Sequence, residues 1–344
     1  MRVAIAEGDG IGKEVIPVSV SIFDYFNKTR DLMIEKVPVE IGFGKWEKTK
    51  EAMTDEDIDV LKSCDAILFG AITTVSDPSY KSVLLRIRKE LDLYANVRPI
   101  RPIRGIYKLC QIQDRKEEDV DIIIVRENTE GLYSGLEEVG EDRSTTTRVI
   151  TKKASQRIAE FASAAASSRK NKLTIVHKSN VLKSDKLFLE TCRQTALDRY
   201  VEPSDKLVDI FAYDLIMSPQ KYDVVVTTNL FGDILSDLGA ALLGSIGLAP
   251  SANIGEKYAL FEPVHGSAPD IAGKKIANPI AAVLSLKMMF EWAGYKKEAA
   301  LIEKAVESSI EEKIVTPDLG GAFSTKEVGF FILDKIKSFD DAVL

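Results

Sequence analysis

The chain has 344 residues and a formal net charge of −7, a length that allows a large core and about two domains. Acidic and basic residues are interspersed, which argues against nucleic acid as the main partner, because neutralising phosphates requires a basic face. Cys64, Cys110 and Cys192 lack a CxxC spacing, so neither a disulfide framework nor a zinc site is indicated. With no secretory signal and no apolar run of about 18 residues, we expect a cytoplasmic protein without a membrane partner.

Short apolar runs alternate with longer amphipathic segments along the chain. The strand-like runs lie at residues 3–6, 65–72, 121–127, 173–178 and 223–229, and the helix-like segments at 14–29, 80–95 and 233–244. This alternation predicts an α/β fold with a largely parallel sheet. The Thr-rich segment 131–155 interrupts it and predicts β-hairpins that project from the body. Helices are expected at 278–294 and 296–312, followed by a Gly-rich turn and a final helix.

Three glycines, Gly8, Gly10 and Gly12, follow the first strand and open a helix. Their GxGxG spacing differs from the GxGxxG fingerprint of Rossmann folds, and no acid ends a second strand about 20 residues later. Two interpretations remain open at this point. The loop is either a tight turn that needs positive φ, or a loop whose backbone approaches a ligand.

Arg88, Arg98 and Arg126 lie in two polar stretches, RIRKELDLYANVRP and IIIVRENTEGLY. Arg98 and Arg126 come at or just after the ends of extended runs, where open α/β sheets place ligands. A guanidinium binds a carboxylate in bidentate fashion, so several converging arginines indicate a small polyanionic substrate. The alternative for each arginine is an ordinary surface ion pair.

Asp233 and Asp237 are four residues apart in an otherwise apolar run. On a helix they would share one face, where like charges destabilise by about 0.2–0.5 kcal/mol. They either cap the helix and mark its solvated face, or they hold a hard divalent cation. Lys178 follows a buried strand and either reaches solvent or, if desolvated beside a metal, acts as a base. Tyr133 is either a half-buried aromatic residue or an acid–base group.

Six stretches in this order resemble one known family. They are GDGIGKE, LRIRKELDLYANVRP, VRENTEGLY, VHKSNVLK, NLFGDILSDLG and FEPVHGSAPDIAGKKIANP. The family is the β-decarboxylating dehydrogenases, which includes isocitrate, isopropylmalate and homoisocitrate dehydrogenases, and the match runs from about residue 2 to residue 335. The resemblance implies a two-domain α/β fold, not a Rossmann fold, with a mixed sheet flanked by helices. Residues 1–99 and 247–344 would form a larger, cofactor-binding domain, and 100–246 a smaller domain with the dimer interface and a β clasp at about 131–150.

The resemblance also assigns catalytic roles. Tyr133 falls on the proton donor, and Lys178 on a basic lysine that the neighbouring subunit of a homodimer or dimer of dimers supplies. Asp233 and Asp237 fall on metal ligands, and Asp209 on a third acid given by the partner. A shared Mg²⁺ or Mn²⁺ would therefore offset the repulsion between the first two. Lys178 would assist removal of the hydroxyl proton, and Tyr133 would protonate the enolate left when CO₂ departs.

Substrate and cofactor positions follow from the same resemblance. Arg88, Arg98 and Arg126 fall on residues that bind the malate-like carboxylates, whereas Asp214 has no counterpart and is expected at the surface. NAD positions are Ile11, Thr74, Glu262, His265, Gly266, Ser267, Ala268, Asp270, Ile271 and Asn278. A carboxylate at Asp270 would accept from ribose hydroxyls and repel a 2′-phosphate. NADP users of the family carry Lys-Tyr in place of Asp270-Ile271, so NAD is expected.

The substrate's identity depends on the group at C3, which the start of the helix at 80–95 would contact. Ser82 falls where isocitrate enzymes hold a third carboxylate, and the loop TTVSDPS before it resembles homoisocitrate or isocitrate enzymes. Leu84 and Leu85 fall where isopropylmalate enzymes contact the isopropyl group. Because Lys81 and Arg86 add donors to this region, homoisocitrate or isocitrate is favoured over 3-isopropylmalate.

The implied reaction is the oxidation and decarboxylation of a (2R,3S)-2-hydroxy acid with a 3-carboxylate, giving a 2-oxo acid, CO₂ and NADH. Two alternatives of other classes are weighed against it. A non-catalytic regulatory subunit of the same fold would have lost part of the acid–base or metal set, which is present here. A Rossmann hydroxyacid dehydrogenase without decarboxylation conflicts with the glycine spacing.

Overall fold

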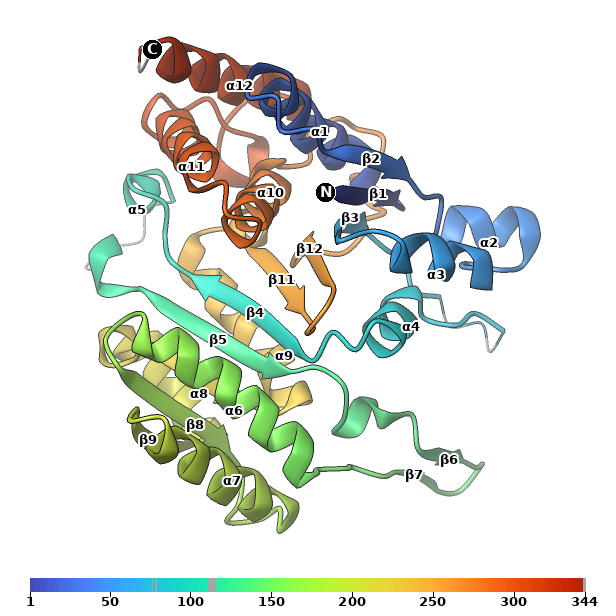
Figure 1. Cartoon of the computed structure of the whole chain (residues 1–344), viewed down its shortest axis with the longest axis vertical. Coiled ribbons are helices and arrows are strands. Elements are labelled where there is room, and N and C mark those ends of the chain that lie inside the picture. Colours follow the sequence, from blue (N-terminus) through green and yellow to red (C-terminus); the bar gives the residue numbers. More distant parts are fainter. Residues whose placement is uncertain (76, 78, 111–115, 343–344) are drawn as a thin grey trace.

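A ten-stranded sheet runs through the whole molecule (Figure 1). The computed structural model describes residues 1–75, 77, 79–110 and 116–342. The strands are β1 (Arg2–Gly8), β2 (Glu35–Pro38), β3 (Ala66–Ala71), β4 (Ala95–Ile100), β5 (Ile122–Glu127), β8 (Lys172–His177), β9 (Glu202–Leu207), β10 (Val224–Thr227), β11 (Pro250–Ile254) and β12 (Ala259–Pro263). Their order across the sheet is β2-β1-β3-β12-β11-β4-β5-β10-β8-β9.

The sheet is largely parallel, as the alternation of runs predicts, but its centre is antiparallel. The pairs β12–β11, β11–β4 and β4–β5 are antiparallel, and the pairs on either side of them are parallel. A short turn can join β11 to β12 because antiparallel neighbours need no crossover, and Gly255 N donates to Tyr258 O in this turn over 2.9 Å. The expected mixed sheet flanked by helices is confirmed.

Twelve α-helices cover the sheet within the described part of the chain. They are α1 (Gly12–Thr29), α2 (Phe43–Thr49), α3 (Asp55–Lys62), α4 (Val83–Glu90), α5 (Ile106–Leu109), α6 (Lys152–Ser167), α7 (Ser184–Asp198), α8 (Val208–Met217), α9 (Asn229–Ala240), α10 (Ile280–Trp292), α11 (Lys296–Glu311) and α12 (Thr325–Asp341). Short 3₁₀ helices span Glu117–Asp119, Leu132–Ser134, Pro219–Lys221, Ala241–Leu243, Ile246–Leu248 and Pro317–Leu319. None of the helices described is long and apolar enough to cross a membrane.

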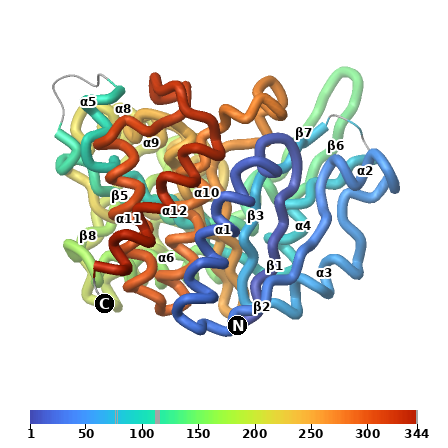
Figure 2. The backbone as a smooth tube through the Cα atoms, turned by 90° about the horizontal axis from the view of Figure 1, so that it is seen from above, coloured from blue at the N-terminus to red at the C-terminus, as the bar shows by residue number. Residues whose placement is uncertain are grey.

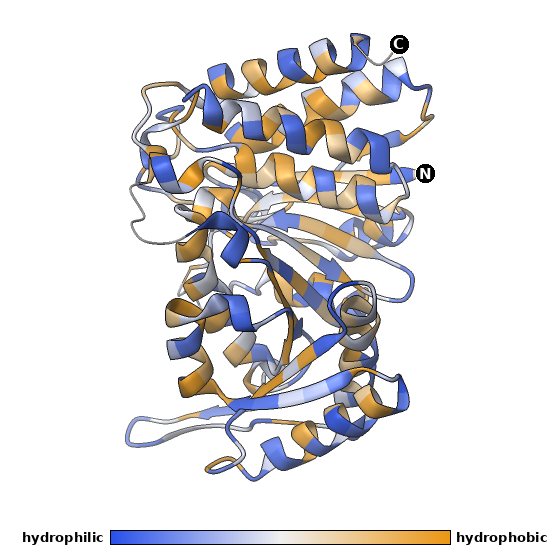
Figure 3. Ribbon diagram, turned by 90° about the vertical axis from the view of Figure 1, so that its left-hand side faces the viewer, coloured by the Kyte–Doolittle hydropathy of each residue, from blue (hydrophilic) through white to orange (hydrophobic). Residues whose placement is uncertain are grey.

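Three hydrophobic cores hold these elements together. The largest lies among α1, α10, α11 and α12, which group together (Figure 2). Of these, α1 packs on β1 and β3, and α10 packs on β3 and β12. A second core lies under α2, α3 and α4, and a third under α6 and α7. The helices turn their apolar stripes inward and their polar faces outward (Figure 3), so most of their stability comes from packing.

A small β-hairpin projects from this body. β6 (Glu137–Val139) pairs with β7 (Ser144–Thr146) in a separate two-stranded sheet (Figure 1). The prediction of β-hairpins over 131–155 is therefore confirmed for one hairpin. It is wrong for the last residues of this segment, because α6 begins at Lys152. Thr151 explains this start, since its side chain accepts a hydrogen bond from Ala154 N over 3.1 Å as an N-cap.

Further boundaries differ from those expected. The helix expected at 233–244 is α9, which begins at Asn229 after the N-cap Thr228, so Asp233 does not cap it. The helix expected at 80–95 is shorter, because α4 ends at Glu90 and Asp92 adopts a positive φ of 46° before β4 begins. The expected domain boundaries at 99/100 and 246/247 fall inside β4 and inside the short helix Ile246–Leu248. The sheet continues through the first of these positions, and the division into two domains stays a prediction.

Candidate active site

Arg98 and Arg126 are brought together by the antiparallel pairing of β4 and β5. The register places Arg98 opposite Ile124 and Arg126 opposite Asn96, so alternation puts both arginines on the same face of the sheet. Helix α9 covers this face. Arg126 is the second-last residue of β5, which pairs in parallel with β10, so it lies near the end of its strand as expected. The same expectation is wrong for Arg98, which lies within the antiparallel strand β4.

The Asp233 carboxylate of α9 is contacted by both arginines on this face and by Tyr133. Its Oδ2 accepts a hydrogen bond from the Tyr133 hydroxyl over 2.7 Å, and its Oδ1 pairs with Arg126 Nη1. Arg98 Nη2 lies 3.7 Å from the same oxygen. Burial alone would raise the pKa of Asp233, but the positive charge of Arg126, the Tyr133 hydrogen bond and Arg98 outweigh it, so the pKa is lowered. The carboxylate is therefore ionised at neutral pH.

Asp237 lies one helical turn further along α9 and is more exposed. Its Oδ1 accepts from Arg98 Nη1 over 3.2 Å, and the same nitrogen donates to Ser236 Oγ over 2.5 Å. Burial raises the pKa of Asp237, Arg98 lowers it, and the nearby Asp233 charge raises it again, with a net increase. The two acids thus repel each other as the sequence suggests. The arginines offset only part of this repulsion. The remaining negative charge of the two carboxylates would favour a bound cation.

Arg126 is 1% exposed and is oriented by a residue that the sequence analysis missed, Asn229. Asn229 Oδ1 accepts from Arg126 Nε over 3.0 Å and from Nη2 over 2.7 Å. Burial, with the charges of Arg88 and Arg98, lowers the pKa of Arg126 to about 10. Asn229 could have been found from its position four residues before Asp233, because residues i and i+4 share a helix face.

Tyr133 lies in the short helix Leu132–Ser134, beside the arginine cluster. The guanidinium carbon of Arg126 lies 5.4 Å from the centre of its ring. Burial and the hydrogen bond to Asp233 both raise the pKa of Tyr133, which keeps the hydroxyl protonated. The turn before Tyr133 is bound to α9 through Glu130, whose backbone O accepts a hydrogen bond from Asn229 Nδ2 over 3.1 Å. These contacts give the tyrosine a fixed orientation toward α9.

Lys178 and Asp209 form a separate pair. Lys178 Nζ lies 2.6 Å from Asp209 Oδ1, and this hydrogen bond lowers the pKa of the Asp209 carboxyl. No group of three or more His, Cys, Asp or Glu side chains that could hold a metal ion forms among the described residues of one chain. Asp209 therefore does not join Asp233 and Asp237 within a single subunit.

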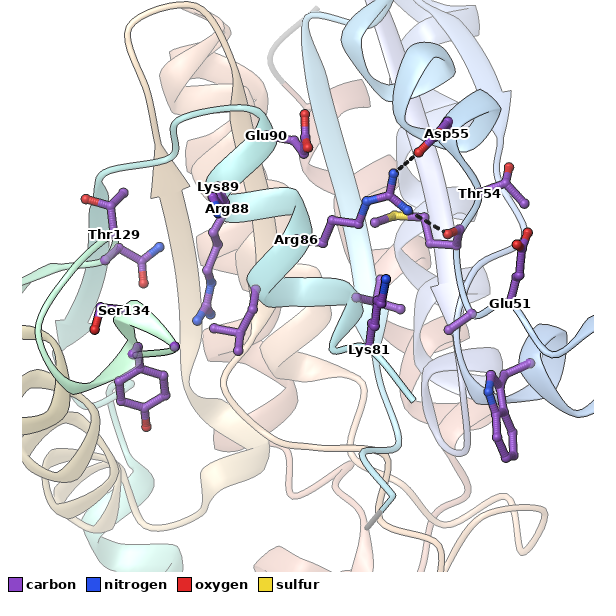
Figure 4. A pocket seen from close by; sticks show the side chains of 18 of the residues that line it. Glu51, Thr54, Asp55, Lys81, Arg86, Arg88, Lys89, Glu90, Thr129 and Ser134 are labelled. Carbon is purple, nitrogen blue, oxygen red and sulfur yellow. Dashed lines mark hydrogen bonds and ion pairs between the residues drawn. The ribbon is translucent and has the colours of Figure 1, made fainter. Parts of the chain in front are cut away.

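A cleft of about 1240 Å³ opens beside Arg88 and Tyr133, between α3, α4 and the turn that carries the tyrosine. Arg86 also lines it but extends away from Arg88 toward Asp55, with which it pairs (Figure 4). Arg86 Nη1 additionally donates to Met53 O over 2.9 Å. The expectation that Arg86 offers a free donor to the substrate is therefore wrong, because both ends of its guanidinium are already bound.

The other residues at the start of α4 divide into two sets. Lys81 and Leu85 line the cleft, and Lys81 has no hydrogen-bond or ion-pair partner within the described part of the chain (Figure 4). Ser82 caps α4, with its Oγ 3.4 Å from Leu85 N, and Leu84 packs on the core under α2–α4. Ser76 and Pro78 of the preceding loop lie outside the described residues.

Arg88 lies at the inner end of the cleft and is 9% exposed. Its Nη2 donates to Glu262 Oε1 over 3.2 Å, and Glu262 also accepts from Asn253 Nδ2 over 2.8 Å. Arg88 Nε is buried and has no hydrogen-bond partner among the described residues. An unpaired buried donor is costly, and a substrate carboxylate in the cleft would satisfy it.

Several of the expected cofactor positions meet around the glycine loop. Ile11 N donates to Ser267 O over 2.9 Å, and Thr73 Oγ1, next in the chain to the expected Thr74, donates to Ser267 Oγ over 2.8 Å. Gly8 and Gly10 have φ values of 71° and 52°, and a Cβ at Gly10 would lie 2.0 Å from Ser267 O. The glycine loop is thus a tight turn with positive φ, and its closeness to 265–271 leaves the ligand interpretation standing.

The remaining positions expected to bind the cofactor lie between residues 265 and 278. His265 Nε2 is buried without a partner among the described residues, and burial lowers the pKa of this imidazole, so its ring is neutral. Gly266 and Asp270 are exposed, while Ala268 and Ile271 are half-buried, Ala268 with a φ of 42°. Asn278 Nδ2 donates to Asp318 Oδ2 over 3.0 Å. An orphaned buried nitrogen beside exposed backbone fits a hydrogen-bonding ligand such as an adenine ring.

His177 and Asp214 are held by hydrogen bonds within the protein. His177 is buried, with its Nε2 3.2 Å from Asp205 Oδ2 and its Nδ1 accepting from Ser179 N over 3.1 Å. Asp214, expected at the surface, is instead half-buried and accepts from the Tyr222 hydroxyl over 2.6 Å. Helix α8 turns this residue toward the short helix Pro219–Lys221, which the sequence pattern does not reveal.

Comparison with known proteins gives one consistent result. The family model described as isocitrate/isopropylmalate dehydrogenase matches residues 2–332. Homoisocitrate dehydrogenase of Methanocaldococcus jannaschii is 46% identical over 345 residues, covering 98% of each chain. A 3-isopropylmalate/3-methylmalate dehydrogenase of the same organism is 43% identical over 346 residues, covering 98% of this chain and 99% of that one.

Solved structures agree with this comparison. The structure of isocitrate dehydrogenase from Methylococcus capsulatus matches with a TM-score of 0.90 and 38% identity, covering 98% of this chain and 99% of that chain. The similarity therefore extends over the whole fold. The family predicted from the six motifs, and the prediction of a decarboxylating dehydrogenase, are confirmed.

Proposed function

The chain belongs to the isocitrate/isopropylmalate dehydrogenase family of decarboxylating oxidoreductases, and we propose that it oxidises and decarboxylates a (2R,3S)-2-hydroxy acid with a 3-carboxylate. The observation that carries the proposal is the convergence of Tyr133, Arg126 and Arg98 on Asp233. In this proposal Tyr133 is the proton donor, the two arginines bind substrate carboxylates, and Asp233 binds the metal. These are the groups that the reaction requires.

The arginines bind and orient the substrate in this proposal. Arg88 lines the cleft with an Nε that is unpaired among the described residues, and Arg98 and Arg126 supply positive charge next to it. Because Asn229 fixes Arg126 and Asn96 Oδ1 accepts from Arg98 Nε over 2.9 Å, the guanidinium groups are preorganised and lose little rotamer freedom on binding. Such fixed cations hold the malate-like carboxylates while the C2 hydroxyl reacts.

Acid and base catalysis would be divided between two residues. Lys178 accepts the proton of the substrate hydroxyl, and NAD⁺ supplies the hydride acceptor when bound. Tyr133, kept protonated by burial and by Asp233, donates its proton to C3 once CO₂ has left. The fixed orientation of the tyrosine hydroxyl toward α9 makes this transfer stereospecific.

For the dinucleotide we propose NAD rather than NADP. His265 Nε2 is available for the adenine, and Asp270 is exposed at the rim of the same loop, where a ribose would lie. A carboxylate there accepts hydrogen bonds from ribose hydroxyls and repels a 2′-phosphate. Ile11, Thr74, Glu262, Gly266, Ser267, Ala268, Ile271 and Asn278 complete the proposed pocket.

For the metal we propose Mg²⁺ or Mn²⁺ between Asp233 and Asp237 of one subunit and Asp209 of a second copy. Carboxylate oxygens are the ligands that such hard cations prefer, and the ion would act as a Lewis acid for the electrons left on the substrate when CO₂ departs. Asp237 and Asp209 have side chains 58% and 57% exposed, so both are free to be shared across an interface.

The same arrangement supports a homodimer with shared sites. Ile210, Tyr213 and Met217 of α8 and Ile234 of α9 are exposed, and α8 and α9 pack side by side. An apolar face beside half of a metal site is the surface that a second copy would cover. We propose that the β6–β7 hairpin, within the smaller domain 100–246, acts as the clasp of this dimer.

For the substrate we propose homoisocitrate or isocitrate. Lys81 lines the cleft without a partner among the described residues and would bind a third carboxylate, and Ser82 caps the helix beside it. Leu85, 41% exposed in the same cleft, favours 3-isopropylmalate as the second candidate.

A direct comparison of substrates tests the proposal. Values of kcat/KM are measured for homoisocitrate, isocitrate and 3-isopropylmalate, each with NAD⁺ or NADP⁺ and Mg²⁺ or Mn²⁺, while NADH and CO₂ are followed together. We expect both products in equal amounts, a preference for a tricarboxylate and for NAD⁺, and loss of activity in EDTA. NADH without CO₂ contradicts decarboxylation, and a preference for 3-isopropylmalate overturns only the substrate assignment.

A further inference from the structure

A buried ion pair between Arg148 and Asp185 lies behind Lys178. Asp185 is fully buried in the first turn of α7, and the Arg148 side chain is 12% exposed. Arg148 Nη1 pairs with Asp185 Oδ1 and donates to Ser184 Oγ over 2.8 Å. Burying both charges is expensive, so such a pair is weak evidence for stability. Its contacts indicate what else it does.

The second oxygen of Asp185 holds the backbone of Lys178. Lys178 N donates to Asp185 Oδ2 over 2.7 Å. The backbone O of Lys178 then accepts from Val181 N over 3.0 Å and from Leu182 N over 2.8 Å, and Asp185 N donates to Leu182 O over 3.0 Å. The turn that carries the lysine is therefore closed on itself and fixed at its first residue by one carboxylate.

Arg148 connects this carboxylate to two other parts of the site. Its Nη2 donates to Thr228 Oγ1 over 3.1 Å, and its guanidinium carbon lies 5.4 Å from the ring centre of Phe231, at the start of α9. On either side of Arg148, Thr147 N donates to Leu136 O over 2.8 Å and Val149 pairs with Gly131. The guanidinium thus sets the position of Asp185 relative to both α9 and the base of the hairpin.

We propose that Asp185 is a positioning residue for Lys178, held in place by Arg148. The inference rests on the proposed function, in which Lys178 takes the hydroxyl proton from the substrate. Because the Asp185 side chain is fully buried, it would act through the Lys178 backbone and not by touching the substrate. The orientation of Lys178 Nζ, which Asp209 holds from the other side, is then fixed by two carboxylates, one buried and one exposed.

The main test separates the two half-reactions with the variant Asp185→Asn. The amide oxygen can still accept from Lys178 N, but the amide NH₂ then points toward the Arg148 guanidinium. Two hydrogen-bond donors face each other, and we expect the turn that carries Lys178 to shift. Oxidation of the hydroxy acid needs the lysine, whereas decarboxylation of the chemically prepared 2-oxo acid, oxalosuccinate in the case of isocitrate, does not. We expect kcat for oxidation to fall about 100-fold, the effect of a displacement near 1 Å, with KM and the decarboxylation rate unchanged.

A matched control is present in the same part of the molecule. Asp223 is also a buried aspartate that pairs with an arginine, with its Oδ1 2.7 Å from Arg169 Nε, and it also accepts from a backbone N–H, that of Lys170, over 3.0 Å. It stands before β10, away from Lys178. Asp223→Asn should lower stability without separating the two half-reactions. The same separation in this control, or a parallel loss of both half-reactions in Asp185→Asn, overturns the proposal.

Two further measurements keep the test decisive. Arg148→Lys retains the charge opposite Asp185 but loses the fork to Ser184 and Thr228, and should give a smaller loss of oxidation in the same direction. Amide hydrogen exchange of residues 178–182 should quicken in Asp185→Asn and in Arg148→Lys but not in Asp223→Asn. This readout needs no turnover. A wild-type protein that oxidises none of the three acids would contradict the proposed function alone, whereas unchanged exchange would overturn the positioning role.

Discussion

The hydroxyl of Tyr133 donates a hydrogen bond to Oδ2 of Asp233 over 2.7 Å, so the expected proton donor and an expected metal ligand are in direct contact. Burial and this hydrogen bond raise the pKa of Tyr133, while Arg126, the tyrosine and Arg98 lower the pKa of Asp233 against the effect of burial. Each group is thereby held in the protonation state that its proposed role needs. The contact also makes the two roles separately testable.

Replacing Tyr133 by Phe should remove proton donation while leaving substrate binding in place. We expect kcat to fall about 100-fold or more, the contribution typical of general acid catalysis, with a KM close to that of the wild type. Steady-state kinetics measure both values. Tyr200→Phe, at a tyrosine that is 91% exposed, is the control, and an equal loss in both variants would remove Tyr133 from the mechanism.

Shared active sites predict complementation between inactive chains. A Lys178→Met dimer and a Tyr133→Phe dimer each lack one group at every site. After subunit exchange, each mixed dimer has one site with both groups intact, so about a quarter of wild-type activity should return in an equimolar mixture. The measurement is activity before and after mild dissociation and reassociation. If activity stays at the level of the two variants, Lys178 and Tyr133 do not meet across subunits.

Gly232→Ala should disturb the arginine cluster. In an exposed helix this change would stabilise by about 1 kcal/mol, but a Cβ at Gly232 would lie 2.6 Å from Cβ and Cγ of Arg126. We expect instead a loss of about 1–3 kcal/mol from overpacking and a higher KM for the hydroxy acid. Urea unfolding and kinetics measure these effects. Gly44→Ala in α2, where the nearest atom is Lys13 Nζ at 3.5 Å, is the control and should be tolerated.

Substrate choice should depend on Lys81 and not on Arg86. If Lys81 binds a third carboxylate, Lys81→Ala lowers kcat/KM for the tricarboxylates about 10- to 100-fold, the value of a hydrogen bond to a charged group, and leaves 3-isopropylmalate unaffected. Arg86→Ala removes the pair with Asp55 and should not alter the ratio between substrates. An altered ratio in Arg86→Ala alone would reverse this assignment.

Alkaline pH should weaken the contact between α1 and α12. The Tyr25 hydroxyl lies 2.9 Å from Asp340 Oδ2, and burial together with this hydrogen bond raises the pKa of Tyr25 to about 12. An unfolded tyrosine titrates near pH 10, so its contribution to stability is complete below about pH 10 and is lost as the pH rises toward about 12. The free energy of unfolding should fall less steeply over this range in Tyr25→Phe than in the wild type, and Tyr200→Phe should keep the wild-type slope.

The sequence by itself determined the fold class and the family, and it predicted the residues of the site. The alternation of apolar runs predicts the α/β class because burial patterns are local properties of strands and helices, and six ordered motifs identify the family. The spacing of Asp233 and Asp237 already places them on one helix face. The glycine spacing excludes a Rossmann fingerprint without any coordinates.

Only the tertiary structure decided which of these residues meet. Arg98 and Arg126 share a face because β4 and β5 are antiparallel, which depends on strand register rather than on either strand's sequence. Asn229 and Asp185 act through contacts 103 and 7 residues away in the chain, and Arg86 is bound by Asp55 across 31 residues. Hydrogen bonds of this kind depend on packed backbones, and packing is a property of the whole chain.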